Sequence, residues 1–246
     1  MSRLWNKVAP DSLISMEEGK KYWETVTADV NGMLGGWPSV TRLDLQGSQK
    51  FLARLGIGVK TGRKVVHRAL DGGAGIGRVT KGLLLDVAEQ VDIVEPVARF
   101  TAGLVGEPGV GQIFNVGLQD WQPQEGVKYD LIWMQWCVGH LPDHLLVQYL
   151  GRCGTALSPE GIIVVKENLS TAGEDWFDEV DNAVTRMDET FMAIFKDADL
   201  QVVRSELQQA FPAIEGRTLL PVKMYALKPR GSGGGRNSMH VYVDIV

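Results

Sequence analysis

Apolar and polar positions change along the chain in blocks, and from residue 65 onward the blocks follow the order typical of α/β proteins. Short apolar runs predict strands at residues 65–71, 90–96, 111–117, 129–136, 161–168, 201–207 and 222–228. Longer segments with a helical spacing of apolar residues predict helices at 79–89, 142–157 and 181–198. Strands that alternate with helices predict a mostly parallel sheet covered by helices.

The segment before this alternation predicts helices and no strand. Residues 15–26 predict a first helix, because Ser15 and Glu18 have the spacing of a capping box. Residues 44–55 predict a second helix. The stretch 31–39 between them is dense in glycine and proline, which predicts a loop.

These patterns divide the chain into an N-terminal helical cap at residues 1–60, an α/β domain at 61–230 and a flexible tail at 231–246. The tail begins with the residues GSGGG, which are typical of a flexible linker. A natural extension, a cloning remnant and an error in the gene prediction would all look like this. No function is therefore inferred from the tail.

The composition adds little to this picture but excludes several classes of protein. The chain has 246 residues, of which 44% are hydrophobic and 22% charged, as in ordinary globular proteins. The net charge of −5 argues against nucleic-acid binding and suits a cationic substrate. No apolar run approaches the roughly 18–20 residues of a membrane-spanning helix, and the two cysteines lack metal-binding spacing. We expect a soluble, reduced protein of the cytoplasm, the nucleus or both, with no metal, nucleic-acid or membrane partner.

The sharpest local signal is a glycine-rich turn after the first predicted strand, where residues 70–78 read LDGGAGIGR. Glycines let the backbone turn tightly and approach a ligand, and the helix that follows offers unpaired N–H groups. A dinucleotide site would have a third glycine where Arg78 stands. An acid, Asp71, followed by GxGxG instead resembles the first motif of the S-adenosylmethionine-dependent methyltransferases.

Polar residues also follow the next two predicted strands. Glu95 ends the strand at 90–96, where a carboxylate can accept both ribose hydroxyls of a nucleotide. Leu118 and Gln119 follow the strand at 111–117, where a polar side chain can hold an adenine amino group. Open α/β sheets bind ligands at the carboxyl ends of their strands, so the three signals together predict a nucleoside-containing ligand. The alternative is a glycine turn flanked by surface acids.

Beyond these motifs, the blocks YWETVTADVNGMLGGW, LDGGAGIGRVTKGLLL, GLQDW, YDLIWMQWCVGHL and GIIVVKENL resemble the eukaryotic α-N-terminal protein methyltransferases, over roughly residues 20–228. The resemblance implies a seven-stranded Rossmann-like class I methyltransferase sheet, with an N-terminal helical extension over the site. It implies S-adenosyl-L-methionine as cofactor. It also implies N-terminal methylation of proteins that expose X-Pro-Lys after loss of the initiator Met.

The matching positions imply a set of cofactor-binding residues. They are Gly73, Gly75, Arg78, Glu95, Leu118, Gln119 and Gln135. Arg78 would pair with the cofactor carboxylate through charge-assisted hydrogen bonds.

The acceptor adds a chemical requirement of its own. A free α-amine has a pKa of about 7.7–8.0 and is mostly protonated at neutral pH, so the site has to bind a cation and remove a proton. From this chemistry and the resemblance together, we expect Asp181 and His140 to share the base role and Asn168 to orient the amine.

The remaining substrate residues are expected around the peptide. Asp178 would hold the lysine at substrate position three, and Trp23 and Trp136 would form aromatic walls that attract a cation. The NGMLGG block would line the peptide channel with Leu34, Gly35 and Gly36. Each residue type also has an ordinary structural role: a structural histidine, a solvated acidic loop, a core tryptophan, an asparagine cap or a simple turn.

Two other functions fit the same cofactor motifs. One is a methyltransferase that acts on a small amine or acid, and the other is a cofactor-binding protein without activity, because fold does not fix function. The set of candidate site residues favours protein N-terminal methylation, by an enzyme that we expect to be a monomer.

Overall fold

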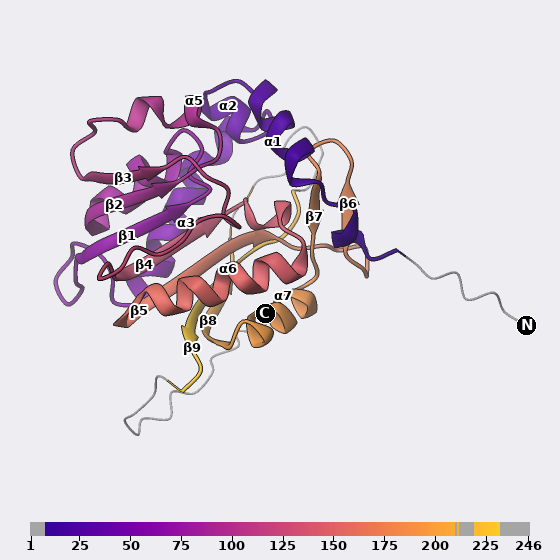
Figure 1. Ribbon diagram of the computed structural model, residues 1–246. Coiled ribbons are helices and arrows are strands. Elements are labelled where there is room, and N and C mark those ends of the chain that lie inside the picture. Colours follow the sequence, from indigo (N-terminus) through magenta and orange to yellow (C-terminus); the bar gives the residue numbers. More distant parts are fainter. Residues whose placement is uncertain (1–7, 210, 212–218, 232–246) are drawn as a thin grey trace, which may run out of the picture.

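The central sheet of the computed structural model has seven strands, and the structure describes residues 8–209, 211 and 219–231 (Figure 1). The strands are β1 (Val66–Gly72), β2 (Ala88–Val94), β3 (Val110–Phe114), β4 (Tyr129–Gln135), β5 (Leu157–Asn168), β8 (Leu200–Leu207) and β9 (Val222–Pro229). Their order across the sheet is β3-β2-β1-β4-β5-β9-β8. Neighbouring strands from β3 to β5 are parallel, whereas β9 is antiparallel to β5 and β8.

The strand order reverses between β1 and β4. The chain adds β2 and β3 on one side of β1, and then returns to add β4 and β5 on the other. Where the order reverses, the loops that leave neighbouring carboxyl ends diverge and open a crevice. Gly72 at the end of β1 pairs with Met134 near the end of β4, so the glycine turn and the WMQW block meet at this crevice.

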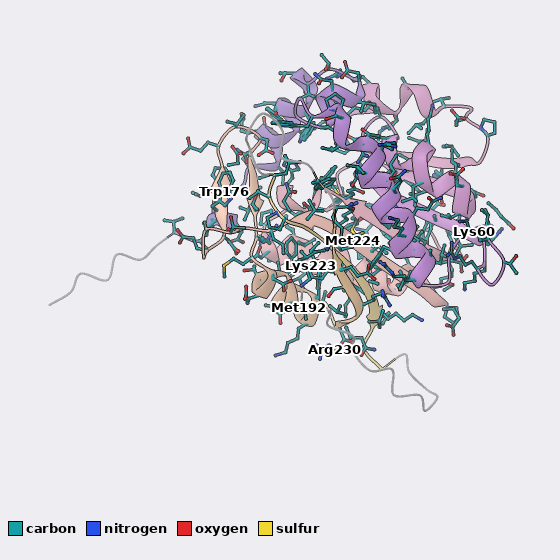
Figure 2. All side chains as sticks on the ribbon, turned by 180° about the vertical axis from the view of Figure 1, so that it is seen from behind. Lys60, Trp176, Met192, Lys223, Met224 and Arg230 are labelled. Carbon is teal, nitrogen blue, oxygen red and sulfur yellow. The ribbon has the colours of Figure 1, made fainter. Side chains whose placement is uncertain are left out.

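Helices pack on both faces of the sheet and over the carboxyl ends of its strands. They are α1 (Met16–Thr25), α2 (Val30–Met33), α3 (Thr41–Arg54), α4 (Leu85–Val87), α5 (Ala98–Thr101), α6 (Asp143–Ala156) and α7 (Asp188–Asp197). In Figure 1, α6 and α7 lie across the near face of the sheet. Figure 2, which shows the molecule from behind, has the helices of the N-terminal half over the opposite face.

The core explains why the strands read as continuous apolar runs. A strand buried on both faces has no reason to alternate with polar residues. Along β4, Ile132 and Met134 join the cluster under α6 and α7, whereas Leu131 and Trp133 join the cluster that contains Phe51 of α3. The predicted α/β class and the seven-stranded sheet with its N-terminal helical extension are therefore confirmed.

The predicted helix at 181–198 is wrong in its first half. The helix begins at Asp188, and the residues before it form a two-stranded hairpin of β6 (Trp176–Asp178) and β7 (Ala183–Thr185). Asn182 turns the hairpin with φ of 58°, a conformation that asparagine adopts more readily than most residues. The side chain of Arg186 is fully buried and bonds outside the hairpin, which holds this segment extended.

Two smaller expectations also differ from the structure. The stretch 31–39, predicted as a loop, begins with the short helix α2, which Asp29 caps by accepting a hydrogen bond from Gly32 N at 2.7 Å. The helix predicted at 79–89 passes through a π-helical turn, Thr80–Leu84, and ends at Val87, where β2 follows at once.

The predicted division of the chain into cap, domain and tail extends beyond the described residues. The proposed boundary at residue 60 stays a prediction, and of the predicted tail only Gly231 lies within the described residues. None of the helices in the described part of the chain is long and apolar enough to cross a membrane.

Candidate functional site

A cavity of about 490 Å³ lies at the carboxyl ends of the parallel strands. Its walls come from the segments that follow β1, β2, β3 and β4, and α1 and α2 contribute Trp23 and Met33 from above. This volume is typical of a pocket for a small ligand or cofactor. Every residue predicted to hold the cofactor lines the cavity, as do Trp23, Trp136 and His140.

The other predicted site residues lie outside these walls. They are Leu34, Gly35, Gly36, Asn168, Asp178 and Asp181. The first three follow Met33, which is in the wall, and Asn168 ends the interior strand β5. Asp178 and Asp181 belong to the β6–β7 hairpin, which sequence patterns did not predict.

The glycine turn brings bare main chain to the cavity. Gly73, Gly75 and Gly77 have φ of 70°, 56° and 79°, in the left-handed region that side chains other than glycine rarely adopt. A Cβ added at Gly73 would lie 2.4 Å from Cys137 Cβ, and one at Gly75 would lie 2.7 Å from Met33 Sδ. The backbone angle therefore favours glycine at all three positions, and at Gly73 the lack of space excludes a side chain as well.

Glu95 ties this turn to the end of β2. One of its carboxylate oxygens accepts a hydrogen bond from Gly75 N and the other from Val97 N, each at 2.8 Å. Burial raises the pKa of Glu95, while these two backbone hydrogen bonds oppose the shift. Each carboxylate oxygen keeps a further lone pair, so Glu95 can still accept hydroxyl groups of a ligand in the cavity.

The loop after β4 is held in a strained conformation. Trp136 has φ of 54°, and such a position costs about 1–3 kcal/mol for a residue other than glycine. Glu167 Oε1 accepts hydrogen bonds from Cys137 N at 2.7 Å and Val138 N at 3.0 Å. Arg186 donates to Val138 O at 3.2 Å and to Leu141 O at 2.6 Å. These bonds fix the indole of Trp136 and the imidazole of His140 in the wall.

The sequence analysis did not identify Glu167 or Arg186 as site residues. Both are buried, and burial raises the pKa of Glu167 to about 7. Arg186 lies in the segment that was predicted as a helix, where a lone arginine reads as exposed. Only the hairpin brings it under the loop after β4.

His140 is bound to the N-terminal extension. Trp23 Nε1 donates a hydrogen bond to His140 Nε2 at 3.0 Å, which links α1 to the loop after β4. Burial lowers the pKa of His140 to about 4, so the ring is neutral at physiological pH. Because Nε2 accepts from Trp23, the proton of the neutral ring sits on Nδ1.

Asp181, in the β6–β7 hairpin, has a carboxylate oxygen to which none of the described residues donates a hydrogen bond. Its Oδ1 is buried and has no hydrogen-bond partner among the described residues, and the same is true of Trp136 Nε1. Burial, and then the nearby charge of Asp178, raise the pKa of Asp181 to about 6. A Cβ added at Gly19 would lie 3.5 Å from His140 Nδ1 and 3.6 Å from the backbone oxygen of Asp181. Asp181 and His140 therefore flank the same turn of α1.

A second hollow lies on the outer side of α1. It has a volume of about 410 Å³, and its walls are Glu18, Lys21, Tyr22, Thr25, Glu179, Val180 and Asn182. Burial raises the pKa of Tyr22, and the charges of Asp181 and Asp178 raise it further. The acidic end of the hairpin thus borders an open hollow next to the cavity, where a cationic group would be attracted.

Comparisons with known proteins match the chain to one family of methyltransferases. The family model described as "AdoMet dependent proline di-methyltransferase" matches residues 11–228. The "Alpha N-terminal protein methyltransferase 1" of Schizosaccharomyces pombe is 45% identical over 217 residues, which cover 86% of this chain and 94% of that protein. The "N-terminal Xaa-Pro-Lys N-methyltransferase 1" of Mus musculus is 41% identical over 214 residues, which cover 84% and 94% of the two chains.

Solved structures show the same architecture. A SAM-dependent methyltransferase of Leishmania major superposes with a TM-score of 0.78 at 35% identity, over 87% of this chain and 82% of that chain. A phosphoethanolamine N-methyltransferase of Haemonchus contortus has a TM-score of 0.68 at 15% identity, over 91% of this chain and 51% of that chain. At that identity the second likeness concerns the fold alone.

Proposed function

The chain belongs to the family of AdoMet-dependent proline di-methyltransferases, and from this premise we propose that it methylates the α-amino group of protein N-termini that expose Xaa-Pro-Lys. The observation that supports this most is the buried, unpartnered carboxylate oxygen of Asp181 beside the cofactor cavity. A site that only bound the cofactor would not need a second acid whose protonation changes near neutral pH.

The cavity fits S-adenosylmethionine, which supplies a sulfonium-bound methyl group for transfer. In our proposal, the main chain at Gly73 and Gly75 lies against the amino-acid half, and Arg78 and Gln135 approach it from the side. Glu95 accepts the ribose hydroxyls, and the adenine lies near two residues of the segment after β3. Those two residues are Leu118 and Gln119.

Asp181 is the residue that we propose as base. An α-ammonium has no lone pair, so a proton has to leave before the nitrogen can accept a methyl group. With a pKa of about 6, the Asp181 carboxyl is ionised at neutral pH and can still take up a proton. His140 was expected to share this role, but in the structure its Nε2 is engaged by Trp23. We therefore propose that His140 acts as a neutral wall residue.

The other predicted residues keep their proposed places around the substrate. Asn168 orients the amine through its side-chain oxygen, and Asp178 pairs with the lysine at position three. Trp23 and Trp136 form aromatic walls for the cation, an attraction of about 0.5–2 kcal/mol. The peptide backbone runs past three residues of the NGMLGG block: Leu34, Gly35 and Gly36. The positive φ of both glycines and the open space around them support a flat channel wall.

The proposal is tested with two peptides that differ only at the α-amine. A Ser-Pro-Lys peptide is incubated with enzyme and S-adenosylmethionine, beside the same peptide acetylated at its N-terminus, and both are followed by mass spectrometry. We expect mass gains of whole methyl groups on the free peptide only. A free peptide with glutamine in place of the lysine should react more slowly, because it lacks the cation for Asp178. Equal reaction of the acetylated peptide would contradict N-terminal methylation and favour a different acceptor.

Turnover is expected to rise with pH between 6 and 8. Asp181, with a pKa of about 6, has to be ionised, and the α-amine, with a pKa of about 7.7–8.0, loses its proton more readily as the pH rises. Both effects have the same sign, and His140, with a pKa of about 4, does not titrate in this range. The measurement is kcat/KM for the free peptide from pH 5.5 to 8.5, with cofactor affinity measured at the same pH values as a control. A flat profile would show that proton removal does not limit the reaction.

A further inference from the structure

A carboxylate of the N-terminal extension lies beneath the wall of the cavity. Asp44 is in the first turn of α3, and its side chain has no solvent exposure. Its Oδ2 accepts a hydrogen bond from Arg78 Nη1 at 2.7 Å, and Gln135 Nε2 lies 2.9 Å from both carboxylate oxygens. Asp44 therefore touches two residues of the cavity wall from behind without reaching the cavity itself.

Lys166 occupies the other side of the same carboxylate. It lies in the interior strand β5 and is fully buried, with its Nζ 2.5 Å from Asp44 Oδ1. The same Nζ donates to Asp44 O, Ser48 Oγ and Gln208 Oε1 at 2.9–3.1 Å. The hydrogen bonds of Lys166 are thus satisfied inside the protein, and none of its partners faces the cavity.

These contacts leave two cations sharing one carboxylate. Lys166 is enclosed, so of these two cations it is Arg78, whose side chain is 8% exposed, that lines the cavity. The Arg78 guanidinium carbon lies 5.4 Å from the centre of the Trp136 ring. A guanidinium is planar and carries its donors in a rigid fork, so holding one end at Asp44 directs the remaining N–H groups.

We propose that Asp44 is a positioning residue that aims Arg78 at the carboxylate of S-adenosylmethionine. The N-terminal extension then contributes to cofactor recognition, although it lies outside the sheet and its glycine turn. The proposal rests on the proposed function only in that the cavity binds this cofactor. It assigns Asp44 no contact with the cofactor and no part in proton removal.

The test compares two ligands that differ in the amino-acid half. S-adenosylhomocysteine carries the carboxylate, and 5′-methylthioadenosine has the same nucleoside without it. Their affinities are measured by calorimetry for the wild type and for Asp44→Asn. We expect Asp44→Asn to weaken S-adenosylhomocysteine about 10–100-fold, the range of a lost charge-assisted interaction, and to leave 5′-methylthioadenosine within about two-fold.

A double-mutant cycle distinguishes a loss of Arg78 orientation from a general disruption of the structure. Arg78→Met should weaken S-adenosylhomocysteine similarly, and Asp44→Asn should add little in the Arg78→Met background, because the two residues act as one unit. Ser48→Ala is the matched control, since it removes a contact of Lys166 and none of Arg78. It should leave both affinities unchanged. An equal loss for both ligands, or no loss for S-adenosylhomocysteine, would overturn the proposal.

A second pair of variants keeps the test open if Asp44→Asn does not fold. Lys166→Met removes the buried cation that would otherwise lose its partner, so Lys166→Met and the double variant Asp44→Asn/Lys166→Met can be compared directly. We expect only the double variant to lose affinity for S-adenosylhomocysteine, and equal affinities would refute the aiming role. If Arg78→Met itself leaves this affinity unchanged, the proposed cofactor site fails instead, which is a distinguishable result.

Discussion

Asp181→Asn is expected to lower turnover of an Xaa-Pro-Lys peptide by about 100-fold or more, the usual contribution of a positioned acid or base. Asparagine has nearly the same shape as aspartate but cannot accept the proton of the α-ammonium. The affinity for S-adenosylhomocysteine should stay near that of the wild type, because Asp181 does not line the cavity. Peptide turnover and calorimetric affinity for S-adenosylhomocysteine together check both halves of this expectation.

The stability of this variant gives an independent check. The pKa of Asp181 is raised in the folded protein, so its charge opposes folding at every pH at which the unfolded carboxyl is ionised. Removing the charge should therefore leave the melting temperature at pH 8 equal or higher. Asp197→Asn, at an exposed position of α7, is the matched control and should change neither turnover nor stability. Wild-type turnover in Asp181→Asn would mean that another group removes the proton.

Gly73→Ala is expected to weaken S-adenosylhomocysteine by about 100-fold, which corresponds to roughly 2.8 kcal/mol at 1.4 kcal/mol per factor of ten. The φ of 70° disfavours any side chain, and the new Cβ would lie 2.4 Å from Cys137 Cβ. Either the glycine turn or the loop after β4 has to shift, and both are walls of the cavity. Strain and overpacking should also lower the free energy of unfolding by about 1–3 kcal/mol.

Gly103→Ala separates this effect from a general cost of replacing glycine. A Cβ added at Gly103 meets no atom within 4 Å, and the residue does not line the cavity. Its affinity for S-adenosylhomocysteine and its denaturant midpoint should match the wild type. If Gly73→Ala bound the ligand as tightly as Gly103→Ala, the turn could not be the place where the main chain meets the cofactor.

The fold was largely predictable because its strands and helices differ in period. The strands β1, β4 and β5 are buried on both faces, so each produces a short apolar run that no amphipathic helix would give. The β6–β7 hairpin was missed because each of its strands is only three residues long, too short to show a strand period. Such a short hairpin is decided by tertiary contacts, here the burial of Arg186, which leave no local pattern in the sequence.

The site residues that come directly after the ends of strands could be predicted from the sequence. The glycine turn, Glu95 and the segment after β3 could be located because carboxyl ends of parallel strands converge. Asp44 could not be placed in this way, because its role depends on the packing of α3 against β5. One signal was present: the buried face of α3 consists of Asp44, Ser48, Phe51 and Leu52, so a carboxylate occupies a position of the apolar stripe. An acid at such a position predicts a buried cation opposite it.

The enclosure of Lys166 makes the sheet dependent on the N-terminal extension. The ammonium group of an interior strand has its partners on α3 and at Gln208, so the sheet carries a charge that only an added segment neutralises. A chain shortened to begin at residue 61 would lack Asp44, the carboxylate that pairs with the Lys166 ammonium. It would also lose Phe51 and Leu52 from the core. Helix α3 therefore packs as part of the same core as the sheet, and its loss would leave the Lys166 ammonium without its carboxylate partner.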